Sequence, residues 1–201
     1  MSFYTGKGDG GTTKLFDSPQ GKRVSKSSPI FETLGMLDEL NSLTGWCRVA
    51  APRELKACGK SVHDILLEVQ DHLFTLQAEV AGAPKAIPQA SVDSMSALIN
   101  GIEKSLPEVK TFLVPGGTEF SARLDIARAV SRRVERRLVA LHESADGFGI
   151  RLCAIACRRG ERPLSESSRA YANRLSSLFY ALVRLENHRA GISERAPVYK
   201  E

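Results

Sequence analysis

Two arginines and a glutamate recur at helical spacing within the stretch RAVSRRVERR. Steps of four and three residues place Arg128, Arg132 and Glu135 on one face of a helix. A planar guanidinium group binds phosphate oxygens through paired hydrogen bonds, so two arginines in a column suit a polyphosphate. The alternative is a solvated charged face, because three further arginines surround this group: Arg133, Arg136 and Arg137.

A second candidate is the glycine-rich stretch YTGKGDGGTTK, residues 4–14. Glycines allow a backbone to turn its N–H groups toward phosphate oxygens, while threonine and lysine side chains add donors and charge. The stretch lacks the GxxxxGKS or GxxxxGKT spacing of a Walker A loop, and no hydrophobic strand precedes it. Taken alone, the stretch is more typical of a flexible N-terminal tail, with a phosphate-binding loop of another kind as the alternative.

Two single polar residues complete the candidates. Asp38, in the stretch GMLDELNS, faces neighbouring helices if Leu37 and Leu40 point inward. A buried aspartate requires a cationic partner, and an arginine of another helix is the natural one. An exposed acid on a helix face is the alternative. Asn173, in the stretch NRLS, has an amide that can bind a phosphate or a purine edge.

Five helices are predicted to position these residues. Their predicted ranges are 29–51, 61–80, 91–105, 121–142 and 165–190. In the first helix we expect an apolar face of Leu34, Leu37, Leu40, Leu43 and Trp46. In the fourth we expect a seam of Leu124, Ala127, Ser131, Val134, Leu138 and Leu141.

Alternating β patterns are almost absent, and Gly- and Pro-rich connections separate the helices. The predicted fold class is therefore all-α, a five-helix antiparallel bundle forming one domain over 1–201. Within it, 1–28 is an N-terminal loop, 29–190 the bundle and 191–201 a C-terminal tail.

The composition, with 42% hydrophobic and 25% charged residues, is that of a globular protein rather than a disordered chain. A net charge of +5 favours a polyanionic partner: a nucleotide, nucleic acid or phospholipid surface. We expect no signal peptide, no membrane-spanning segment and a cytoplasmic location. The four cysteines are interpreted as free thiols, with a metal site at the last two as the alternative: Cys47, Cys58, Cys153 and Cys157.

Four stretches in this order resemble the PduO-type ATP:cob(I)alamin adenosyltransferases. They are YTGKGDGGTTKLFD, VSK followed by FETLGMLDELNS, FLVPGGTEFSARLDIARAVSRRVERR, and YANRLSSLFYALVRLEN, which together span Phe3 to Asn187. The resemblance implies a homotrimer of bundles with a ferritin-like up-down core and an active site at each subunit interface. It also implies transfer of the 5′-deoxyadenosyl group of ATP to Co(I) of cobalamin, which gives adenosylcobalamin and triphosphate.

The resemblance also implies roles for single residues. The implied ATP contacts are Thr5, Gly6, Lys7, Gly8, Thr13, Lys26, Arg132, Arg133, Glu135, Arg136 and Asn173, with Mg²⁺ on the phosphates. Asp38 and Arg128 match a pair that forms an intersubunit salt bridge beside the corrin. Phe112 matches the aromatic residue that displaces cobalamin's lower base and leaves the cobalt four-coordinate. Tyr180, at a position that is commonly Phe, is expected at the cobalamin.

The chain departs from the family pattern at several places. Gly6 and Lys7 stand where a basic residue and a Thr are usual, Asp125 replaces a His, and Ser177 replaces an Asp. The connection 145–162 is longer than expected. These departures affect the expected substrate contacts more than the expected fold.

Two other functions stay open at this point. One is a corrinoid carrier or chaperone with the same fold, and the other is a basic helical nucleic-acid-binding protein. The Arg-rich stretch lacks the interleaved aromatic residues that stack on bases, and no helix-turn-helix is recognisable, so no nucleic acid is expected. For an adenosyltransferase, a flavoprotein reductase and a B12-dependent enzyme are the expected protein partners.

Overall fold

The computed structural model describes residues 4–16, 18, 22–146 and 164–199. In this part of the chain the helices are α1 (Pro29–Ala50), α2 (Val62–Val80), α3 (Gln89–Lys104), α4 (Glu119–Asp146) and α6 (Glu166–Arg189). Two short antiparallel hairpins pair β1 (Thr12–Thr13) with β2 (Val24–Ser25), and β3 (Lys56–Ala57) with β4 (Lys60–Ser61). The prediction of a mainly helical chain with these five helices is confirmed.

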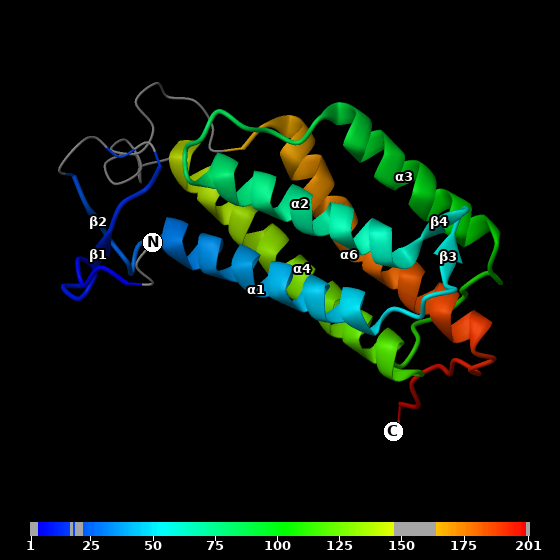
Figure 1. Ribbon diagram of the computed structural model, residues 1–201. Helices are drawn as coiled ribbons and strands as arrows, with labels where there is room; N and C mark the ends of the chain where they lie inside the picture. The colour runs from blue at the N-terminus through cyan, green and yellow to red at the C-terminus, as the bar shows by residue number, and fades with distance from the viewer. Residues whose placement is uncertain (1–3, 17, 19–21, 147–163, 200–201) are drawn as a thin grey trace.

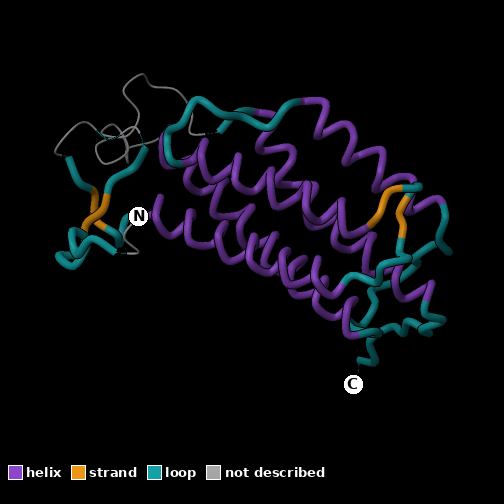
Figure 2. Tube along the Cα trace, viewed as in Figure 1, coloured by secondary structure: helices purple, strands orange, loops and turns teal. Residues whose placement is uncertain are grey.

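The helices alternate in direction along the bundle (Figure 1). Helices α1, α3 and α6 run one way, and α2 and α4 run the other. Helix α4 packs against both α1 and α6, while α2 covers α1 and α3 covers α6. The two hairpins lie at opposite ends of the bundle (Figure 2). Within the described ranges, no helix is long and apolar enough to cross a membrane.

Helix α4 begins two residues before the predicted start and continues four residues past the predicted end. Its start is fixed by a reciprocal cap, in which the Ser121 amide donates to Thr118 Oγ1 at 3.1 Å and the Thr118 amide donates to Ser121 Oγ at 2.9 Å. Helix α6 has a similar cap, because the Ser168 amide donates to Ser165 Oγ at 3.2 Å. Side-chain caps therefore set two of the helix ends that carry the candidate site.

The predicted apolar face of α1 is wrong in part. Leu37 and Leu40 are fully buried, but Trp46 is 46% exposed and lies under the guanidinium group of Arg123 at 4.3 Å. The buried residues are Thr33, Met36, Leu37, Leu40, Asn41, Thr44 and Cys47. A repeat of three residues advances only about 300° per step, so it rotates away from the core, whereas alternating steps of three and four do not.

The predicted seam of α4 is confirmed, since all six of its residues are buried. This seam faces the neighbouring helices, whereas Arg132, Arg133, Arg136 and Arg137 of α4 are exposed. The burial of one side thus determines which arginines reach the surface.

Cys47 and Cys58 have free thiols, as predicted, while Cys153 and Cys157 lie outside the described residues. Burial raises the pKa of the Cys47 thiol to about 11, and Cys58 is exposed. At pH 8 only about one Cys47 thiol in a thousand is then ionised. We expect iodoacetamide to alkylate Cys58 at least about 100-fold faster than Cys47 in the folded protein, as measured by peptide mass spectrometry. Similar rates at both sites would contradict the burial of Cys47, with urea-unfolded protein as the control.

Candidate active site

The glycine-rich stretch folds into two successive turns. The amide of Asp9 donates to the Gly6 carbonyl at 3.2 Å, and the amide of Gly11 donates to the Gly8 carbonyl at 3.1 Å. Gly6 and Gly11 have φ angles of +65° and +72°, a region that favours glycine. The Lys26 amide closes the loop by donating to the Gly11 carbonyl at 2.9 Å. The stretch is therefore an ordered loop closed by the β1–β2 hairpin.

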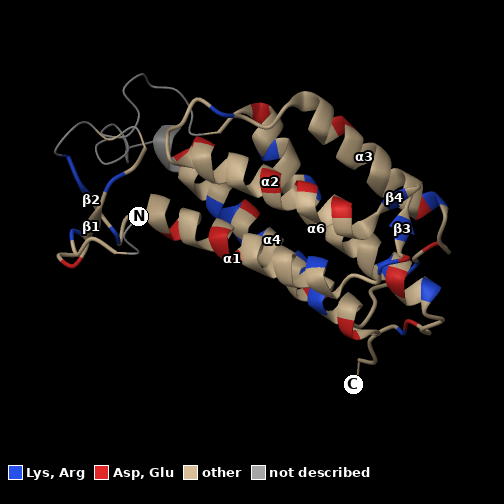
Figure 3. Ribbon diagram, viewed as in Figure 1, with Lys and Arg blue, Asp and Glu red and all other residues tan. Residues whose placement is uncertain are grey.

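The side chain of Lys26 also lies over this loop. A Cβ atom on Gly8 would stand 3.1 Å from Lys26 Nζ, so glycine is what allows the ammonium group to approach the backbone. Arg23 anchors the hairpin by donating from Nε to Thr12 Oγ1 at 2.8 Å. Thr5 and Lys7 are exposed, and several Lys and Arg positions lie along the ribbon of this hairpin and its loops (blue in Figure 3). Exposed donors and cations around glycine turns suit an anionic ligand.

Helix α4 presents a second set of cations. Arg132 and Arg136 are exposed and form no ion pair with another described residue. Arg133 differs, because its guanidinium group lies 2.7 Å from Glu39 of α1. Unpaired arginines on a helix surface are free to bind phosphate oxygens in pairs.

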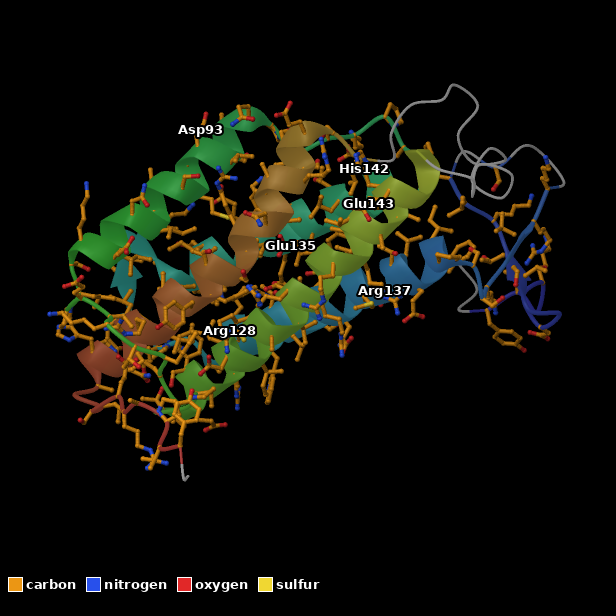
Figure 4. All side chains as sticks on the ribbon, turned by 180° about the vertical axis from the view of Figure 1, so that it is seen from behind. Asp93, Arg128, Glu135, Arg137, His142 and Glu143 are labelled. Atoms are coloured by element: carbon orange, nitrogen blue, oxygen red, sulfur yellow. The ribbon has the colours of Figure 1, made fainter. Side chains whose placement is uncertain are left out.

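Helices α4 and α6 meet beside these arginines. The Asn173 side chain donates from Nδ2 to Glu135 Oε1 at 2.5 Å. Glu135 faces α6, whereas Arg137 faces α1 on the other side of the helix (Figure 4). On the α1 side, a hollow of about 640 Å³ is lined by Glu32, Met36, Glu39, Arg133, Arg136, Arg137 and Ala140. The structure thus brings the predicted polar residues of α4 and α6 together.

The residues expected at the corrin occupy a different part of α4. Arg128 donates from Nε to Asp125 Oδ1 at 3.1 Å, within the same helix. Both residues line a hollow of about 500 Å³ with Pro115, Gly116, Ala122, Ile126, Ala129, Val130 and Arg133. Asp38 is exposed on α1 and has no ion pair within the described chain, so its expected burial against an arginine is not found in a single subunit.

Phe112 lies in the connection between α3 and α4 and is 81% exposed. Tyr180, of α6, is half-buried and lines a second hollow of about 590 Å³ with Leu106, Pro107 and Val109. Ser177 lines the same hollow. Phe112 itself lines neither hollow, so its ring is open to a ligand or a partner.

Within one chain, the glycine-rich loop and the arginines of α4 lie apart. No hydrogen bond or ion pair of the described residues joins Thr5–Lys14 to α4; instead, the Phe16 amide donates to the Ala81 carbonyl at the end of α2. The loop projects beyond the end of the bundle (Figure 1). Arg132 lies 14 residues before the end of α4, which corresponds to about 21 Å along the helix. Within the described part of one chain, the loop and Arg132 are therefore not bonded to each other.

Sequence reasoning missed two polar residues near Phe112. Asn187 donates from Nδ2 both to the Gly116 carbonyl, in the segment that precedes α4, and to Glu194 Oε1. Nothing in the local sequence indicates this role, because the partners are far apart along the chain. The only signal was the Pro-Gly-Gly turn at 115–117, which predicts a close backbone approach without identifying what approaches it.

Among the described residues, no three His, Cys, Asp or Glu side chains form a group that could hold a metal ion. Phosphate oxygens of a bound nucleotide can supply ligands for Mg²⁺.

The family model for cobalamin adenosyltransferase matches residues 3–186. The corrinoid adenosyltransferase PduO of Salmonella typhimurium is 37% identical over 204 residues, covering 96% of this chain and 52% of the relative. The chain thus spans about half the length of the PduO relatives that it matches. The corrinoid adenosyltransferase of Bacillus subtilis is 33% identical over 201 residues, covering 96% of this chain and 91% of the relative.

A solved structure has the same fold. It is a variant of the PduO-type ATP:corrinoid adenosyltransferase from Lactobacillus reuteri, complexed with cobalamin and ATP. It superimposes with a TM-score of 0.78 at 24% identity, covering 98% of this chain and 99% of that one. The glycine-rich loop and the α4 arginines both lie within residues 3–186, which the family model matches. This chain belongs to the cobalamin adenosyltransferase family.

Proposed function

We propose that this chain is an ATP:corrinoid adenosyltransferase, which transfers the 5′-deoxyadenosyl group of ATP to Co(I) of cobalamin. The observation that carries the proposal is that Arg132 and Arg136, which form no ion pair with another described residue, are exposed on the same helix as Glu135, which is bonded to Asn173. These groups suit a triphosphate and its neighbouring polar atoms, and the solved relative is complexed with both ATP and cobalamin.

The reaction requires little acid–base chemistry from the protein. The electron pair of Co(I) attacks the ribose C5′, the Co–C bond forms, and the C5′–O bond breaks with its electrons passing to the triphosphate. The protein must align cobalt with C5′ and stabilise the charge that grows on the leaving oxygens. In the proposal, the positive charges of Arg132, Arg136 and Lys26 stabilise the negative charge on those oxygens, and Mg²⁺ arrives with the nucleotide.

The corrin is assigned to the surface around Phe112. An aromatic side chain against the lower face would displace the axial base and exclude water, which leaves the cobalt four-coordinate and easier to reduce. Two observations support this assignment. Phe112 is exposed, and the residues before and after it in the sequence line hollows: 106–109 line one and 115–116 line the other. Tyr180 would contact the corrinoid from the hollow beside α6. The electron for Co(II) would come from a flavoprotein reductase in the cytoplasm.

A homotrimer with sites between subunits is part of the proposal. It is supported by the separation of the loop from the α4 arginines within one chain and by the unpaired Asp38. Sedimentation should give three times the chain mass of 21.9 kDa. A fully active monomer in the same experiment would refute the intersubunit site.

Asp38→Asn tests the proposed bridge from Asp38 to Arg128 of another subunit. We expect the KM for cob(I)alamin to rise about tenfold, because Arg128 loses a charged partner beside the corrin, while the KM for ATP stays within about twofold. Asp71→Asn, an exposed aspartate of α2, is the matched control. Equal changes in both KM values would contradict the assignment of Asp38 to the corrinoid side.

The function itself is tested by turnover. The purified chain, ATP, Mg²⁺ and chemically reduced cobalamin should yield many equivalents of adenosylcobalamin per chain, identified by its light-sensitive absorption spectrum. A corrinoid carrier would bind without turnover or stop at one equivalent. Salt-dependent DNA binding without turnover would instead favour the nucleic-acid-binding alternative.

A further inference from the structure

The segment that carries Phe112 is held to three other parts of the chain. The Val114 amide donates to the carbonyl of Arg195 at 2.9 Å. The Gly116 amide donates to Asp125 Oδ2 of α4 at 3.0 Å, and the Gly116 carbonyl accepts from Asn187 Nδ2 of α6 at 3.1 Å. An exposed connection therefore has a fixed backbone, set by α4, α6 and the C-terminal segment together.

Asn187 is the centre of this arrangement. Its side chain is 1% exposed, and its Nδ2 also donates to Glu194 Oε1 at 3.0 Å. A Cβ atom on Gly117 would lie 2.2 Å from Asn187 Oδ1, and Gly117 has a φ of +144°. The turn thus fits closely around this one amide, so a shift of Asn187 moves the turn.

Glu194 holds the amide in place from the C-terminal segment. Its Oε2 accepts from Arg184 Nε at 2.6 Å, and the two side chains are only 17% and 10% exposed. Arg184 Nη2 also donates to the Pro107 carbonyl at 3.2 Å. A charge pair this shielded from water is strongly coupled, unlike an exposed surface pair. The pair is bonded to both ends of the connection between α3 and α4. Arg184 binds the Pro107 carbonyl, and Glu194 binds Asn187, which binds the Gly116 carbonyl.

We propose that Glu194 is a positioning residue that, through Arg184 and Asn187, fixes the connection 107–117 and so presents Phe112 to the lower face of the corrin. This inference rests on the proposed function. The same hydrogen-bonded series continues from Gly116 to Asp125 and Arg128, so the aromatic wall and the cation beside it share one support. The ATP contacts lie on other segments and are outside this series.

Glu194→Gln is the test, because it keeps the size of the side chain and removes the charge that pairs with Arg184. In the ATP-bound variant, the fraction of cob(II)alamin that is four-coordinate, measured by electron paramagnetic resonance, should fall at least about threefold. The KM for cob(I)alamin should rise about tenfold and the KM for ATP should stay within about twofold, since a small displacement at a reacting centre is costly. Glu194→Asp keeps the charge on a shorter side chain. Its values should lie between those of the wild type and those of Glu194→Gln.

Glu54→Gln is the matched control, since it removes a carboxylate from the exposed pair with Arg189 at 3.2 Å. It should leave every value unchanged. Hydrogen exchange gives a readout that does not depend on catalysis: the Val114 and Gly116 amides should exchange at least about tenfold faster in Glu194→Gln. Unchanged exchange and an unchanged four-coordinate fraction would overturn the inference. Faster exchange in a chain whose wild type forms no adenosylcobalamin would overturn the proposed function and leave the support of the turn standing.

Discussion

Arg132→Lys is expected to lower kcat/KM for adenosylation by roughly 30- to 1000-fold, which corresponds to about 2–4 kcal/mol of barrier. The substitution keeps the positive charge but replaces a planar fork of donors with a single ammonium group. Arg132 has no acidic partner among the described residues, so its guanidinium group is available for the phosphates. The measurement is steady-state formation of adenosylcobalamin with ATP as the varied substrate.

Arg53→Lys is the matched control, because Arg53 is an exposed arginine in the connection after α1 and does not line the hollow that holds Arg133 and Arg136. Its replacement should change kcat/KM by less than about threefold. If Arg132→Lys keeps nearly normal turnover, the arginine face of α4 is only a solvated surface.

Phe112→Ala is expected to separate the two cobalt oxidation states. Without the aromatic wall, the axial base or water returns to the cobalt, so adenosylation that starts from cob(II)alamin and a reductant should fall at least about 100-fold. Adenosylation from pre-reduced cob(I)alamin should fall less than about tenfold, because Co(I) already favours four-coordination. The KM for ATP should change little, since the phosphate contacts lie on other segments.

Because Phe112 is highly exposed, its replacement by Ala should leave the stability of the folded chain nearly unchanged. A side chain that is 81% exposed adds little packing within the chain, so the free energy of unfolding should change by less than about 0.5 kcal/mol. Phe74→Ala removes the same ring from α2, where Phe74 is 61% exposed and lines neither hollow assigned to the corrin, so it should leave both rates unchanged. Equal losses from cob(II)alamin and cob(I)alamin in Phe112→Ala would show that the residue does not displace the base.

Much of the fold followed from the spacing of apolar residues. The α4 seam alternates steps of three and four, matches the helical period, and was predicted residue by residue. The α1 face was predicted from a repeat of three and failed at Trp46, because that repeat rotates off the core. The C-terminal extension of α4 was missed because its last residues, which include Glu143, are polar and carry no apolar period.

The candidate site was predictable where its members are close in sequence. Arg132 and Glu135 are three residues apart on one helix, so their spacing alone predicted a shared face, whereas Arg128 is paired with Asp125 in another part of α4. The contact of Lys26 with Gly8 depends on a hairpin of two-residue strands, too short to show a β pattern. The bond from Glu194 to Asn187 depends on how the C-terminal segment folds back onto α6, which no local pattern encodes.

Co-expression of two defective variants tests the central claim, that adenosyl transfer occurs at a site built from the loop of one chain and α4 of another. Lys26→Ala impairs the loop and Arg132→Ala impairs α4, so each homotrimer alone should be nearly inactive. In randomly mixed trimers, about one quarter of the interfaces join an intact loop to an intact α4, so adenosylcobalamin formation should recover to about a quarter of the wild-type rate. Mixed trimers that form no more adenosylcobalamin than the two variants alone would contradict the account.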